Sequence, residues 1–196
     1  MSRLGVIAIA LALMTNLCSC GNSAENMHER IHSKFYTMPS YTAQCQMTVN
    51  SNKTSNKYDF TCTYDNAGNR YRIDYPDLSV ILTETDARII RGDSVINIPS
   101  DDGHMLMFVN TFFESYYAGE NASIEVSSGA DSGFTVLETE LISPTKFGHS
   151  MKLWINNKTM APRTMKVYDE EGKETIAVAF EGFETAKLVE EEKFTQ

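Results

Sequence analysis

Three alternating segments near the C-terminus, between His149 and Phe183, constrain the fold more than any other part of the sequence. Apolar side chains take every second position in them: Met151, Leu153 and Ile155, then Met165 and Val167, then Ile176, Val178 and Phe180. A period of two is typical of strands with one buried face and one wetter face. The connecting segments NKTMAP and EEGK contain asparagine, proline and glycine, which favour turns. This stretch therefore predicts an antiparallel meander, and it contains no obvious catalytic residue.

The preceding part of the chain predicts eight further strands and two helices, in a single domain over residues 25–196. The strands are expected at Tyr41–Val49, Tyr58–Tyr64, Tyr71–Tyr75, Leu78–Thr83, Ala87–Arg91, Ser94–Ile98, Ala122–Ser128 and Phe134–Ile142. The helices are expected at Glu25–Met38, which Pro39 ends, and at Met105–Tyr117, which is unusually aromatic. The predicted fold class is mainly β (α+β) with about eleven antiparallel strands. The acidic segment Ala186–Phe194 is expected to be a solvated edge.

The N-terminus has the pattern of an export signal. Arg3 precedes an apolar stretch, Leu4–Leu17, that is too short and too weakly flanked for a membrane-spanning helix. The stretch ends in Leu-Cys-Ser-Cys-Gly, which resembles a bacterial lipobox around Cys20. We therefore expect a signal peptide at residues 1–19, a lipidated tether at residues 20–24 and an anchor on the extracytoplasmic side of a bacterial membrane. An ordinary signal peptide cleaved nearby is the alternative.

Composition and charge exclude two classes of partner. The chain is 42% hydrophobic and 22% charged, which is ordinary for a globular protein. Its net charge of −9 argues against binding nucleic acid, because a phosphate backbone attracts basic surfaces. The same charge argues against docking on anionic lipid headgroups. We therefore expect any membrane attachment to depend on the lipid anchor.

Two cysteines, Cys45 and Cys62, lie in the body of the chain on the apolar faces of consecutive predicted strands. They are nearly equidistant from the loop between those strands, so a cross-strand disulfide is one interpretation. An exported protein meets the oxidising conditions that such a bond needs. The alternative is a pair of reduced cysteines that pack as small hydrophobic side chains.

One motif resembles a catalytic site, the His-Glu-x-x-His sequence from His28 to His32. On a helix this spacing places two imidazoles one turn apart, as in zinc peptidases. No third ligand follows at a familiar spacing, and the motif begins eight residues after Cys20, before any strand that would form a cleft. We therefore expect a polar helix face, no metal, no cofactor and no enzymatic activity.

The C-terminal meander also resembles a known family. Asn156, Thr159, Pro162, Asp169 and Gly172 match the turns of the lipoprotein carrier superfamily, the LolA and LolB type. The order of helix, six strands, apolar helix and five strands is similar to that family as well. The resemblance implies a curved, unclosed half-barrel whose two helices form a lid. It extends to lipid-anchored relatives in Gram-positive spore formers, such as the clostridial germination lipoprotein that partners a cortex amidase.

Two functions follow from this resemblance. The first is a carrier that holds an acyl chain, a lipoprotein or another hydrophobic ligand on its concave face. The second is an interaction scaffold that supports an envelope enzyme such as a spore-cortex amidase. The aromatic helix favours the carrier slightly, since it is more apolar than one sheet face needs. A wide apolar cavity would favour the carrier, and a cavity plugged by Phe108 and Phe112 would favour the scaffold. The expected cavity residues are Met47, Phe60, Tyr71, Ile73, Phe108, Phe112, Tyr116, Met151, Leu153, Met165, Val167, Ile176 and Val178.

Overall fold

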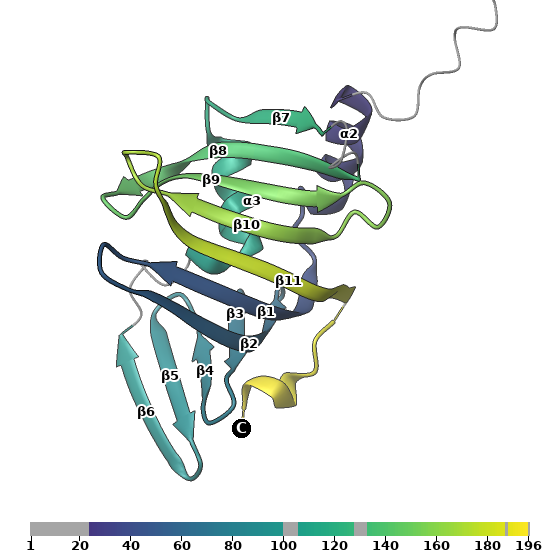
Figure 1. Ribbon diagram of the computed structural model, residues 1–196. Coiled ribbons are helices and arrows are strands. Elements are labelled where there is room, and N and C mark those ends of the chain that lie inside the picture. Colours follow the sequence, from purple (N-terminus) through teal and green to yellow (C-terminus); the bar gives the residue numbers. More distant parts are fainter. Residues whose placement is uncertain (1–23, 100–105, 128–132, 187, 196) are drawn as a thin grey trace, which may run out of the picture.

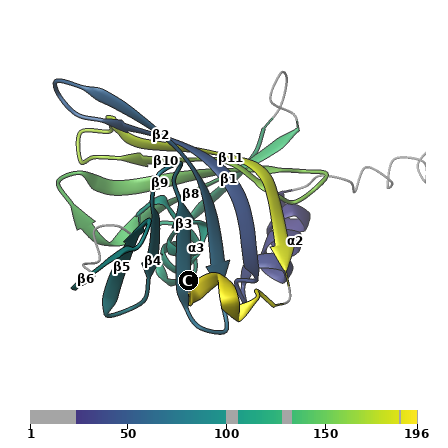
Figure 2. The same cartoon turned by 90° about the horizontal axis from the view of Figure 1, so that it is seen from below.

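The computed structural model describes residues 24–99, 106–127, 133–186 and 188–195. These residues form one antiparallel sheet of eleven strands in the order β6-β5-β4-β3-β2-β1-β11-β10-β9-β8-β7. The two edge strands, β6 and β7, do not pair with each other, so the sheet curves without closing (Figures 1 and 2). The predicted mainly β half-barrel is therefore confirmed. The expected signal peptide, the tether to Ser23, Cys20 and Met105 lie outside the described residues.

The elements follow the predicted order, with ends that differ by a few residues. The strands are β1 Ser40–Asn50, β2 Ser55–Asp65, β3 Arg70–Asp74, β4 Ser79–Leu82, β5 Asp86–Arg91, β6 Ser94–Pro99, β7 Ser123–Val126, β8 Phe134–Thr145, β9 Gly148–Asn156, β10 Pro162–Tyr168 and β11 Glu174–Ala186. Helix α2 spans Ala24–Phe35 and ends three residues before the expected Met38. Helix α3 spans Val109–Ala118.

Both helices lie on the concave side of the sheet, as Figure 2 shows from below. Helix α3 packs against β8, and helix α2 packs against β7. The two helices also meet each other, because the rings of Phe35 and Phe113 stack with their centroids 4.6 Å apart. The buried residues of α2 are Met27, Ile31 and Phe35, which share one face of the helix at a spacing of four residues.

The turns explain why the family-like motif residues occur where they do. The Asn156 side-chain oxygen accepts hydrogen bonds from the backbone N–H groups of Lys158 and Thr159, at 2.9 and 3.0 Å. The Asp169 side chain does the same for Lys173 at 2.8 Å, and Gly172 beside it has a φ of 76°. Short polar side chains that bond the backbone two to four residues on favour tight turns. These residues therefore specify the hairpins between β9, β10 and β11.

Helix α2 is also attached to the turn between β9 and β10. Arg30 donates to the backbone carbonyl of Asn157 at 3.1 Å, and Lys34 donates to the carbonyl of Met160 at 3.0 Å. Partial burial lowers the pKa of the Lys34 ammonium, because desolvation disfavours its charged form. These basic side chains join the first helix to a turn more than 120 residues later in the chain.

The C-terminal segment is mostly exposed, as its prediction as a solvated edge implies, but it has one buried side chain. Residues Glu191–Phe194 form a short 3-10 helix, and Phe194 is only 5% exposed. Glu190, Glu191 and Glu192 are exposed, as predicted. The burial of Phe194 was missed because the three glutamates before it made the segment resemble a solvated tail. The ring of Phe194 packs instead under the guanidinium of Arg70, 4.2 Å from its centroid.

Candidate functional site

The concave face carries all the residues that the sequence analysis assigned to a ligand cavity. Eleven of the thirteen are buried members of one hydrophobic cluster, and Met47 and Ile176 are partly buried against it. They come from β1, β2, β3, β9, β10, β11 and α3 with its preceding turn. The sheet alternation therefore brings the expected residues together on one face, as predicted.

Aromatic rings from α3 fill the centre of this face. Phe108, at the start of the helix, stacks on Tyr71 of β3 with centroids 3.9 Å apart. Phe112 is 0% exposed and contacts Phe113 and Tyr116, at centroid distances of 5.5 and 5.8 Å. Edge-to-face and offset-stacked rings at such distances are favourable packing arrangements. The concave face is thus occupied by the protein's own side chains.

A few polar groups lie inside this aromatic core. Asn110 of α3 donates a hydrogen bond to the Tyr71 hydroxyl, and the buried Tyr41 hydroxyl has no hydrogen-bond partner among the described residues. Burial raises the pKa of both tyrosine hydroxyls, because the phenolate form would lose its hydration. Both groups therefore stay protonated at neutral pH, and neither has the lowered pKa that a nucleophile or base needs.

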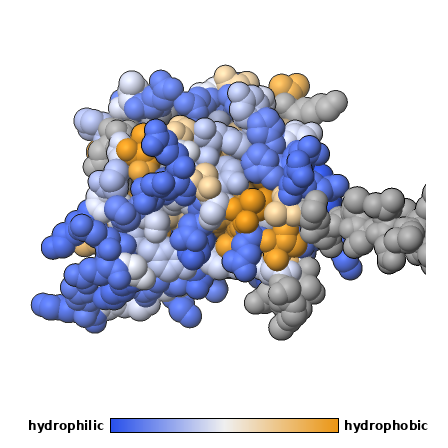
Figure 3. All heavy atoms as spheres, turned by 90° about the horizontal axis from the view of Figure 1, so that it is seen from above, coloured by the Kyte–Doolittle hydropathy of each residue, from blue (hydrophilic) through white to orange (hydrophobic). Residues whose placement is uncertain are grey.

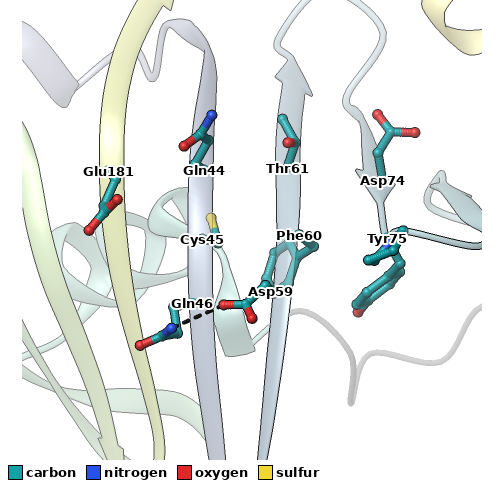
Figure 4. A pocket seen from close by; sticks show the side chains of 10 residues that line it. Gln44, Cys45, Gln46, Asp59, Phe60, Thr61, Asp74, Tyr75 and Glu181 are labelled. Atoms are coloured by element: carbon teal, nitrogen blue, oxygen red, sulfur yellow. Dashed lines mark hydrogen bonds between the residues drawn. The ribbon is translucent and has the colours of Figure 1, made fainter.

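A pocket of about 390 Å³ lies against β1, β2 and the end of β3, and Phe60 is the one expected cavity residue in its lining. Figure 4 shows its mixed lining, with Gln46 donating to Asp59 at 3.1 Å. The lining residues are Gln44, Cys45, Gln46, Asp59, Phe60, Thr61, Asp74, Tyr75, Pro76 and Glu181. Its carboxylates do not form a metal site, since no group of three or more metal-ligating side chains occurs in the described ranges. Its lining mixes polar and apolar side chains, whereas sites for apolar ligands are lined predominantly by hydrophobic ones.

The His-Glu-x-x-His motif lies on α2, and both of its histidine rings contact aromatic side chains. The His32 ring stacks on Tyr36 at 4.5 Å and meets Tyr117 of α3 edge-on at 5.3 Å. The His28 ring lies 6.3 Å from Tyr116. The motif therefore contributes aromatic contacts between α2 and α3, which helical spacing alone did not predict. The signal was present in the aromatic pair Tyr116 and Tyr117 at the end of α3.

Cys45 and Cys62 are both buried free thiols. The register pairs Cys45 with Phe60 and Cys62 with Ala43, so the two cysteines occupy diagonal rather than opposite positions. Diagonal partners are about 7–8 Å apart, farther than a disulfide usually spans. Of the two interpretations that the sequence left open, this structure has the reduced pair. A disulfide would need Cys45 directly opposite Cys62, but the observed register places Phe60 opposite Cys45. The sequence did not reveal this shift of two residues.

We expect both thiols to resist alkylation in the folded protein. Burial raises the pKa of Cys45 to about 12 and also raises that of Cys62, so at pH 8 both stay in the unreactive thiol form. The extent of alkylation is measured by labelling with iodoacetamide before and after denaturation, followed by mass spectrometry of the peptides that contain Cys45 and Cys62. We expect label on both residues only after denaturation. Peptides joined by a disulfide before reduction would contradict the prediction.

Comparison with known proteins identifies a family. The model of the family described as sporulation protein YdcC-like matches residues 1–194. The chain belongs to this YdcC-like family. A search of curated protein sequences finds no match for the YdcC-like chain. Among its described residues, no helix has the length and hydropathy needed to cross a membrane.

Several solved structures resemble the YdcC-like chain. An uncharacterized conserved protein from Thermus thermophilus has 12% identity and a TM-score of 0.50, with 87% of this chain and 92% of that chain covered. A chain in the structure of the CwlD amidase from Clostridioides difficile in complex with the GerS lipoprotein has 22% identity and a TM-score of 0.48, with 84% of this chain and 97% of that chain covered. The LolA superfamily protein NE2245 from Nitrosomonas europaea has 11% identity and a TM-score of 0.47, with 89% of this chain and 98% of that chain covered. These identities are too low to transfer a function.

Proposed function

We propose that this YdcC-like protein is a non-enzymatic scaffold, anchored by lipid on the extracytoplasmic side of the membrane, that binds another protein of the envelope. The observation that carries the proposal is the filled concave face, with Phe112 fully buried among rings from α3. The family's description as sporulation proteins supports a role in a spore-forming bacterium. An enzyme of the spore cortex, such as an amidase, is the partner class that we propose.

The filled face favours the scaffold over the carrier. An acyl chain needs an apolar volume, and here Phe108, Phe112 and the strand residues opposite them already occupy it. A ligand would have to displace α3, which would expose several large rings to water. The carrier function therefore requires a second arrangement of this helix, whereas the scaffold function uses the fold as it stands.

The exposed surface for a protein partner is the hairpin of β5 and β6, which projects from the body of the sheet (Figure 1). Strand β6 is exposed along its length, and its Val95, Ile96 and Ile98 side chains are all exposed. It is also an edge strand, so half of its backbone N–H and C=O groups have no partner strand among the described residues. Such an edge can pair with an extended segment of another protein. The side that carries β7 and α2, seen from above in Figure 3, is mostly hydrophilic, with one hydrophobic patch beside the grey residues and smaller separate groups.

Charge substitution on β6 tests this function. We propose Ile96→Lys, with Ile142→Lys on β8 as the matched control, since the two isoleucines are 57% and 62% exposed. Chemical cross-linking in native membranes, followed by mass spectrometry, identifies proteins joined to each variant. We expect the wild type and Ile142→Lys to cross-link to the same envelope protein, and Ile96→Lys to lose at least about 90% of that product, because a charge opposes strand addition.

Two results would contradict the proposal. One is equal cross-linking by Ile96→Lys and the wild type, which would remove β6 from the interface. The other is co-extraction of a stoichiometric lipid with no cross-linked protein, which would favour the carrier. Measuring the thermal unfolding of both variants shows whether either change acts through the stability of the fold.

A further inference from the structure

The C-terminal segment Leu188–Thr195, here called the C-terminal strap, is held against the outer face of β3 by side-chain recognition. The outer face is the one opposite Tyr71 and Ile73, which point into the core. Arg70 donates to the carboxylate of Glu191 with two nitrogens, one of them at 2.9 Å. The same guanidinium lies over the buried Phe194 ring. The strap is therefore bound through one carboxylate and one aromatic ring, three residues apart. Figures 1 and 2 show the path of its backbone beside the β2–β4 end of the sheet.

Two more arginines bind the strap through its backbone. Arg72 donates to the carbonyl of Lys193, and Arg88 donates to the carbonyl of Thr195 at 3.2 Å. The register of the sheet places Arg72 and Arg88 in one line across the strands. The line consists of direct cross-strand partners on β3, β4, β5 and β6: Arg72, Ile81, Arg88 and Asn97. Direct partners share a face of the sheet. A row of side chains thus crosses four strands beside the strap.

This row continues beyond the strap into a pocket of about 420 Å³. The pocket is lined by Arg70, Ile81, Thr83, Asp86, Arg88, Asn97 and Phe194. The Nε atom of Arg88 is buried there and has no hydrogen-bond partner among the described residues. A buried donor without an acceptor is costly, so the groove is built to receive more acceptor groups than the strap supplies.

We infer that this outer face of β3–β6 is a peptide-binding groove, which the C-terminal strap occupies in place of a segment of the partner. The partner segment carries a carboxylate and, three residues later, an aromatic side chain. Hydrogen bonding favours such an occupant, since the guanidinium groups of Arg70, Arg72 and Arg88 all donate to the strap. Arg70 and Arg72 do so while also paired with Asp65 and Asp74. This inference rests on the proposed scaffold function and names the chemistry of its partner.

The strap has the properties of a replaceable occupant. Its only regular element is four residues long and has no side-chain cap, and Leu188 at its start is exposed. Phe194 lies outside the main hydrophobic cluster, so its release leaves the half-barrel core intact. When the strap of the same chain occupies the groove, a competing peptide can bind only to the molecules in which the groove is open. Its apparent affinity is therefore reduced by that fraction. Release of the strap should therefore raise the affinity for a peptide added in trans.

The test uses the full chain and a fluorescent peptide with the strap sequence LVEEEKFT, followed by fluorescence anisotropy. We expect Phe194→Ala, which removes the buried anchor of the strap, to bind this peptide at least about tenfold more tightly than the wild type. The matched control is Leu188→Ala, a change in the same strap at an exposed side chain, and it should bind like the wild type. A peptide carrying Glu191→Lys should bind Phe194→Ala at least about tenfold more weakly than LVEEEKFT.

A second variant releases the strap without truncating a buried side chain, in case Phe194→Ala does not fold. Glu191→Lys in the chain breaks the contact with Arg70 at an exposed side chain and should also increase binding of LVEEEKFT. Equal binding by the wild type and both released variants would overturn the inference. So would a dimeric wild type that becomes monomeric in Phe194→Ala, because the occupant would then be the strap of a second copy. The peptide assay needs no partner and the β6 cross-linking needs no strap release, so failure of the groove and failure of the scaffold function are distinguishable.

Discussion

Replacing Phe112 with alanine should destabilise the protein by about 3–5 kcal/mol. Phe112 is 0% exposed and lies between Phe113 and Tyr116 in the centre of the concave face. Truncating a ring in a filled core loses its transfer free energy and leaves a cavity that the neighbours only partly fill. Chemical denaturation followed by circular dichroism measures the change in the free energy of unfolding. In a hollow groove the same ring would have fewer neighbours, and its loss would cost much less.

Phe147→Ala is the matched control, since the same side chain is 71% exposed at the tip of the hairpin between β8 and β9. We expect it to change the free energy of unfolding by less than about 0.5 kcal/mol. An apolar fluorescent probe should not bind the wild type. A small loss of stability in Phe112→Ala together with probe uptake by the wild type would support the carrier instead.

The sequence predicted the sheet well because its information is local. Alternating apolar residues such as Met151, Leu153 and Ile155 place one face of a strand in the core whatever lies beside it. The turn residues Asn156 and Asp169 act within five residues of themselves. Helix α3 was predicted by its spacing too, although it begins later than Met105–Tyr117 implied. The curvature came from the family resemblance, and the order of the strands within the sheet was not predicted, because pairing between distant strands leaves little trace in one sequence.

The surfaces proposed as sites were harder to predict, since they depend on contacts distant in the chain. Phe194 is a single aromatic residue after three glutamates, and its burial depends on Arg70, more than 120 residues earlier. The alternation of Arg70 and Arg72 with Tyr71 and Ile73 could have indicated a charged face opposite the core. The choice between core and cavity for Phe112 could not be predicted either, because it depends on how closely α3 approaches the sheet.

The anchor would fix how the molecule presents these surfaces. Four Cα–Cα steps separate Cys20 from Ala24, the first residue of α2, and they span at most about 15 Å. Helix α2 is in turn held to the body by Arg30, Lys34 and the stacked ring of Phe35. Figure 1 shows α2 and the β5–β6 hairpin at opposite ends of the molecule. A lipid on Cys20 would therefore hold the α2 end near the membrane and direct β6 away from it.

Cys20→Ala should move the protein completely from the membrane fraction to the soluble fraction. In the proposed lipobox Cys20 would be the acylated residue, and stable attachment would depend on its acyl chains because a net charge of −9 gives no attraction to anionic headgroups. Cys18→Ala, two residues earlier, is the matched control and should stay acylated and membrane-bound. Metabolic labelling with a clickable palmitate analogue, combined with fractionation, measures both effects. Persistent label on Cys20→Ala would place the anchor elsewhere, and the α2 end would then have no fixed distance from the membrane.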